Sequence, residues 1–146
     1  MAGSVKVRDA SALLSDVYRN VRMAEDSIIN LMPKVTEEKL KNMLTVQISV
    51  YSAFSSRAAK ELAEAGVKPE EENTMTKMGA KMGMVMNTML DTTTSHLAEM
   101  MINGATMGII DLEKKLNDGG DGEAERLARD VLRFEKETAE RLSTFP

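Results

Sequence analysis

The sequence contains no cysteine and no tryptophan, and it has few other aromatic residues and few prolines. The absence of cysteine excludes disulfides, thiolate metal ligands and cysteine nucleophiles. Two tyrosines and three phenylalanines are the whole aromatic content of the 146 residues, and there are three prolines. Because strands favour aromatic and β-branched residues whereas helices favour Ala, Leu, Met, Glu and Lys, this composition predicts an all-α protein.

An excess of positive charge and a long hydrophobic run are also missing. Nineteen Lys and Arg residues stand against 23 Asp and Glu residues, which gives a formal net charge of −4. Binding to nucleic acid depends largely on neutralising phosphates, so we expect no nucleic-acid partner. A membrane span needs about 20 consecutive apolar residues, and no such run is present. The first residues lack the apolar segment of a secretory signal, so we expect a cytoplasmic location and no membrane partner.

Helix-breaking residues divide the chain into four amphipathic segments within a single domain, residues 1–146. Asp9 or Ser11 can cap the first helix and Thr36 the second, while Gly66 is a typical C-terminal stop. The predicted helices span residues 10–32, 36–65, 74–116 and 122–143. Short connections between long helices favour antiparallel neighbours, so the sequence predicts an up-down-up-down four-helix bundle with a long third helix.

The third segment has almost no charge along its middle part. Between Met82 and Ile110 the charged residues are Asp91 and Glu99. Because a surface helix normally has a polar face, we expect this one to be buried on two sides, by the bundle core and by a second copy of the chain. Its length predicts a kink, an overhang or a break. The polar stretch 91–96 is either a pocket that includes His96 or a kink in the helix.

Small residues and methionines are concentrated in the same segment. Nine of the thirteen methionines lie between Met75 and Met107. Core packing is the simplest interpretation, and the alternatives are a thioether copper(I) site or an adaptable pocket for an apolar small molecule. Gly104 and Gly108 are one helical turn apart, as are two earlier glycines, at 79 and 83. This spacing is compatible with close backbone approach.

Polar residues interrupt the apolar faces of three helices. Glu25 lies beside apolar positions of the first helix, Gln47 of the second and Glu135 of the fourth. Burying a carboxylate is costly unless it is paired or bound to a metal. With His96 or Glu99 from the third helix, these groups could meet in the middle of the bundle. The alternative is that the carboxylates lie at the edge of the apolar stripe, near water, paired with a neighbouring arginine (Arg22, Arg129 or Arg133).

This arrangement resembles the ferritin-like superfamily over residues 10–143. Its metal-binding members place a Glu on each of two helices and Glu-x-x-His on the other two. In this chain the second helix has Gln47 followed by Val50, and the fourth has Glu135 followed by Thr138. Both histidines are replaced and one Glu is a Gln. The resemblance therefore implies a ferritin-like bundle whose di-iron site has degenerated.

Two functions follow as expectations. The favoured one is a non-enzymatic binding or scaffold protein without a cofactor, which forms a homodimer through the third helix. The alternative is a metal-binding oxidoreductase or metal carrier that holds iron or another transition metal. Its candidate ligands are the three carboxylates and the single histidine, Glu25, His96, Glu99 and Glu135.

Overall fold

The computed structural model describes residues 2–68, 89–116 and 122–145, with side chains described from Ala10 onward. Within these ranges the chain forms four α-helices, one short 3₁₀-helix and no strand, which confirms the all-α class. The elements in chain order are α1 (Ala2–Leu31), η1 (Met32–Lys34), α2 (Glu38–Glu64), α4 (Thr94–Lys115) and α5 (Glu123–Leu142).

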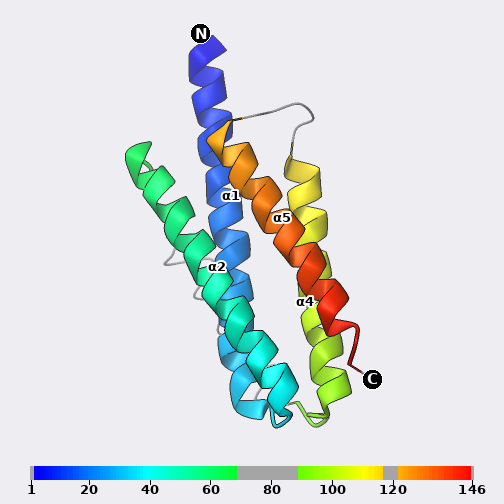
Figure 1. Ribbon diagram of the computed structural model, residues 1–146. Helices are drawn as coiled ribbons and strands as arrows, with labels where there is room; N and C mark the ends of the chain where they lie inside the picture. The colour runs from blue at the N-terminus through cyan, green and yellow to red at the C-terminus, as the bar shows by residue number, and fades with distance from the viewer. Residues whose placement is uncertain (1, 69–88, 117–121, 146) are drawn as a thin grey trace.

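The four helices lie side by side along one long axis (Figure 1). α1 and α2 are antiparallel and joined through η1, and α4 runs antiparallel to α5. α2 and α4 run in the same direction, so the up-down-up-down order expected from the sequence is not the observed one. That expectation assumed a short connection after the second helix. In the structure α2 ends and α4 begins at opposite ends of the bundle.

The core is built from the apolar stripe of each helix, much as the spacing predicts. The buried leucines and valines recur three or four positions apart on α1, α2 and α5, because that spacing returns a side chain to the same face of a helix. Aromatic rings from α2 and α5 meet edge-to-face, with the centroids of Tyr51 and Phe134 5.0 Å apart. Side chains with no exposed surface include Val17, Val21, Ile28, Leu40, Leu44, Leu62, Leu112, Leu127 and Val131.

Helix ends follow the expected chemistry with two corrections. α1 begins at Ala2 rather than near residue 10, because neither proline nor glycine interrupts residues 4–9. α2 is capped by Glu37, whose carboxylate accepts a hydrogen bond from the Leu40 amide at 2.8 Å, and not by Thr36. The stop at Gly66 is confirmed: its φ of 75° is in the left-handed region, and the next amide bonds back to the Leu62 carbonyl.

The third predicted helix, residues 74–116, is interrupted within the described part of the chain. Residues 89–93 are not helical, and Thr93 is the N-cap of α4, since its hydroxyl accepts from the His96 amide at 3.3 Å. Asp91 in turn accepts from the amide and hydroxyl of Thr93 at 3.0 and 2.8 Å, which lowers the pKa of Asp91. The polar stretch is therefore a helix start rather than a kink inside a helix, and of the three expectations the break is the one observed.

One face of α4 packs into the bundle. Leu97, Ala98, Met101 and Leu112 are its buried residues. The sequence offered His96 as one of the groups that could meet in the middle of the bundle, but its side chain is 37% exposed. The methionines from 75 to 86 and the glycines at 79 and 83 lie outside the described residues.

No helix in the described part of the chain combines the length and the hydropathy that crossing a bilayer requires.

Candidate functional site

A cavity of about 900 Å³ lies between the four helices. We call it the central cavity. Its volume is within the range of small-molecule sites, about 300–1,000 Å³. Much of its wall is flexible and apolar, and comes from the middle of α1 and α4. These residues are Met23, Ala24, Met100, Met101, Met107 and Ile110.

Polar side chains from α2 and α5 form a buried part of the same cavity. Gln47 and Tyr51 lie one turn apart on α2, and Glu135 and Thr138 lie one turn apart on α5. Gln47 is 4% exposed and Glu135 is 2% exposed. Both amide atoms of Gln47 and one carboxyl oxygen of Glu135, Oε1, have no hydrogen-bond partner in the described structure. Such buried groups destabilise a fold by about 1–3 kcal/mol each unless water or a ligand satisfies them, which makes this region a candidate binding site.

The environment of Glu135 favours its neutral form. Burial raises the pKa of Glu135 to about 8, and the negative charge of Asp111 on α4 adds to the effect. Burial, and then the negative charge of Glu135, also raise the pKa of Tyr51 above its usual value. At neutral pH the buried end of the cavity therefore presents a carboxylic acid, a phenol and an amide, all mostly uncharged.

The backbone of α4 comes unusually close to this polar end at Gly108. The Asn20 side chain on α1 donates a hydrogen bond to the Gly108 carbonyl at 3.1 Å. A Cβ at this position would collide with the Glu135 carboxyl group and press on Asn20. Gly104, one turn earlier, has open space where its Cβ would be. The close approach considered from the spacing of the two glycines is thus found at Gly108 and not at Gly104.

Charged residues of α1 and α4 also border the cavity. Lys115 on α4 forms ion pairs with Asp16 on α1 at 3.3 Å and with Asp111 at 3.1 Å. Arg19 on α1 lies 3.7 Å from Asp16. These side chains are partly exposed, so water screens their charges more than it screens the charge of buried Glu135.

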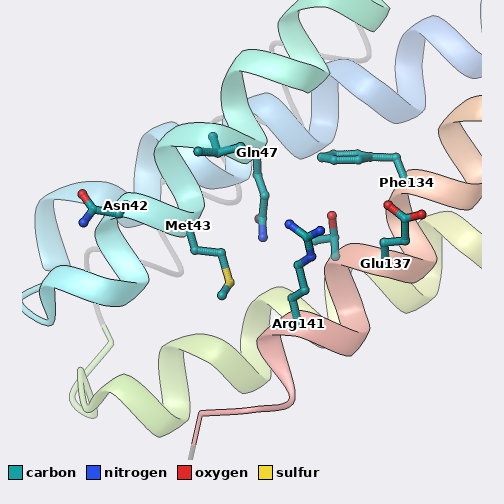
Figure 2. Close-up of a pocket in the computed structure, with 8 residues that line it drawn as sticks. Asn42, Met43, Gln47, Phe134, Glu137 and Arg141 are labelled. Atoms are coloured by element: carbon teal, nitrogen blue, oxygen red, sulfur yellow. The ribbon is translucent and has the colours of Figure 1, made fainter.

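A smaller cavity of about 280 Å³ lies between α2 and α5 on another side of the bundle. Figure 2 shows Met43 and Gln47 from α2 and Arg141 from α5 extending toward one another across it, while Asn42 points away. Gln47 and Thr138 line both cavities. These two buried side chains therefore separate the smaller cavity from the central one.

The four candidate metal ligands are found in different environments. Glu25 is buried but does not line the central cavity, and it lies 3.4 Å from Arg22, one of the arginines that the sequence offered as its partner. His96 is in the first turn of α4, where its Nδ1 is 3.9 Å from Asp91. Glu99 is exposed, and Glu135 alone of the four lines the central cavity. In residues 2–68, 89–116 and 122–145, no three His, Asp or Glu side chains form a cluster that could hold a metal ion.

Sequence reasoning identified two of the polar residues in the cavity, Gln47 and Glu135, from their position inside apolar stripes. It treated Tyr51 and Thr138 as ordinary core positions and did not consider Asn20. Spacing could have suggested the first two, because each is one turn from a polar residue already singled out. Nothing in the sequence indicates that Asn20 bonds to the backbone of another helix.

Comparison of the chain with protein-family models, with curated proteins and with solved structures finds no match. The functional argument therefore depends on the geometry of the central cavity.

Proposed function

We propose that the chain is a non-enzymatic binding protein that holds a small amphipathic molecule in the central cavity. The observation that carries this proposal is the pairing of a methionine-rich wall with buried polar groups that lack partners, Gln47 and Glu135. A ligand with a polar end and an apolar body would satisfy the polar atoms and cover the apolar wall. Of the alternatives considered from the sequence, the adaptable pocket for a small molecule is the one that this geometry supports.

Binding rather than catalysis is favoured by the chemistry of the lining. The described lining residues include Glu135 as a buried acid but no histidine, and His96 lies elsewhere. A general base works best with a second positioned group that orients it or accepts its proton. We therefore infer that Glu135 recognises a ligand.

A distant relation to ferritin-like proteins remains part of the proposal. Ferritin-like bundles contain one long crossover connection, so two consecutive helices run in the same direction. The parallel course of α2 and α4 is compatible with that arrangement (Figure 1). A metal ion would need several of the four predicted ligands to lie close together. Metal binding therefore stays a prediction from the sequence.

We also propose that two copies associate through α4. Met107 is 72% exposed and Ile110 is 50% exposed, although both are large apolar residues. A second copy covering this face would remove them from water, which supports the homodimer expected from the sequence. Light scattering at micromolar concentration tests this: a dimer that becomes a monomer in Met107→Glu supports it, and a monomer in the unaltered protein contradicts it. The cytoplasmic location likewise stays a prediction.

The test of the binding function uses Nile red, a neutral apolar dye that fluoresces in apolar sites. We expect saturable binding with one site per chain. Ala24→Phe, which places a large side chain in the cavity, should weaken binding at least tenfold. Ala63→Phe, at an exposed position of α2 away from both cavities, is the matched control. Circular dichroism shows whether each variant folds.

Two results would contradict the proposal. One is the absence of saturable dye binding together with the absence of any co-purified molecule in native mass spectrometry. The other is equal binding by both variants, since the dye would then occupy some other surface.

A further inference from the structure

We propose that the ligand of the central cavity is an aliphatic amine, bound as its ammonium ion with the charged end at Glu135 and Gln47 and the chain along the methionine wall. This inference rests on the proposed binding function and specifies its ligand class. It is carried by the position of a buried acid that has no cationic partner at the polar end of an apolar cavity.

The acceptors at the polar end match the donors of an ammonium group. Glu135 Oε1 and the side-chain oxygen of Gln47 are buried acceptors without a described partner. An ammonium ion has three donors and no acceptor, so it can donate to a carboxylate oxygen and to further acceptors around it. A hydrogen bond between an ammonium ion and a carboxylate is also roughly twice as strong as one between neutral groups.

Two of the positive side chains that border the cavity are already paired with carboxylates. Lys115 is paired with Asp16 and Asp111, and Arg19 is paired with Asp16. Lys114 borders the cavity but is exposed. When Glu135 ionises in the complex, the cation that pairs with it must therefore come from the ligand, and an anion such as a fatty acid would be repelled.

The apolar wall suits an unbranched chain. Methionine side chains are flexible and polarisable, so they adapt to a chain whose conformation varies. Each methylene that leaves water should tighten binding about fourfold. Octylamine is therefore expected to bind about fifteenfold more tightly than hexylamine.

Binding of an ammonium ion changes the protonation of Glu135. The acid–base groups around Glu135 are those that border the cavity, namely Asp16 and Arg19 on α1, Tyr51 on α2, and Asp111, Lys114 and Lys115 on α4. Because burial and Asp111 hold the free carboxyl group mostly protonated at neutral pH, it must lose its proton to pair with the ammonium ion. The balanced step is a carboxylic acid plus an ammonium ion giving a carboxylate–ammonium pair and one proton released to water. At about pH 7 each bound amine should release close to one proton.

The pH profile of affinity follows from the same step. Affinity for octylamine should rise nearly tenfold for each pH unit up to about pH 8, where free Glu135 becomes ionised. It should then stay level until the amine itself loses its proton, at about pH 10 by analogy with lysine. Octanol, which has the same chain and no charge, should show neither the rise nor the proton release.

Isothermal titration calorimetry of octylamine, octanol and octanoate into the full chain tests the proposal. Titrations in buffers of different ionisation enthalpy count the protons released. At about pH 8 we expect octylamine to bind at least tenfold more tightly than octanol, with octanoate weakest. Glu135→Gln should remove the preference for the amine and the proton release. Glu140→Gln, at an exposed position of the same helix, is the matched control and should leave both unchanged.

The outcomes separate this inference from the function on which it rests. If octanol and octylamine bind equally without proton release, the cavity binds ligands but the amine class is wrong. If none of the three compounds binds and Nile red does not bind either, the proposed function fails and the inference with it. If Glu135→Gln does not fold, the pH profile of the unaltered protein decides, since an amine bound in its neutral form would also release a proton but its affinity would keep rising up to about pH 10.

Discussion

The sharpest prediction concerns the stability of the ligand-free protein as the pH rises, and it depends on Glu135. The carboxyl group has a pKa of about 8 in the folded chain and an ordinary value of 4.5 when exposed. Between these two values the folded state holds a proton that the unfolded state has lost. Stability must therefore fall as the pH rises from about 4.5 to about 8, and it should level off above that range.

The size of the effect follows from the shift. One pKa unit corresponds to about 1.4 kcal/mol, so the unfolding free energy should drop by about 4 kcal/mol between about pH 5 and pH 9 through this single residue. That is a large part of the 5–15 kcal/mol typical of a folded domain. In Glu135→Gln the side chain cannot ionise, and this part of the pH dependence should disappear.

The assay is urea unfolding followed by far-ultraviolet circular dichroism across this pH range. At about pH 9 we expect Glu135→Gln to be more stable than the unaltered protein by about 4 kcal/mol, or roughly 10–15 °C in thermal midpoint. At about pH 5 the difference should be below about 1 kcal/mol. Glu140→Gln is the control for a surface carboxylate. Parallel pH profiles for Glu135→Gln and the unaltered protein would show that Glu135 is not held neutral by burial.

The remaining predictions concern α4. Gly108→Ala should destabilise the fold by about 1–3 kcal/mol, because its methyl group would displace the Glu135 carboxyl group. Gly104→Ala should instead stabilise the fold by about 0.5–1 kcal/mol. Thermal unfolding measures both, and equal effects would contradict the close approach of the backbone at Gly108. Thr93→Ala removes the N-cap of α4 and should lower the free energy of unfolding by about 1 kcal/mol. Amide hydrogen exchange should become faster in the first turn of α4. Unchanged exchange there would mean that the helix starts elsewhere. Elemental analysis of the purified, untagged protein should give well under one transition-metal ion per chain, because the described carboxylates and His96 do not gather; a stoichiometric metal ion would restore the metal-binding alternative.

Local sequence patterns predicted α1, α2 and α5 well because each has a continuous apolar stripe at helical spacing. The same reasoning singled out Glu25, Gln47 and Glu135, since each interrupts such a stripe, but left open whether the two carboxylates are buried or lie near water. All three side chains are buried. It did not predict the start of α4. The residues before and after Thr93 are both compatible with a helix, and the break is produced by a hydrogen-bonded cap that involves Asp91.

The central cavity could not be predicted because it depends on the space left between helices, which no single helix encodes. Gln47 and Glu135 share the cavity whereas Glu25, buried to a similar degree, lies outside it beside Arg22. Counting residues along a helix predicts how far along the bundle axis a side chain lies, but not how the helix is rotated about its own axis. The rotation of α4, which brings Gly108 against Glu135 and leaves His96 at the surface, follows from contacts made after the helices pack.

The two glycines of α4 give the cavity one fixed and one adjustable position. At Gly108 the wall is backbone in close contact with the ends of the Asn20 and Glu135 side chains, so a side chain added there must displace them. Gly104 borders the same cavity and leaves room for a side chain. Substituting progressively larger residues at Gly104 would narrow the cavity from one side while its polar end stays intact. Selectivity among ligands of different girth can thus be engineered at one residue, independently of the chemistry that holds their polar ends.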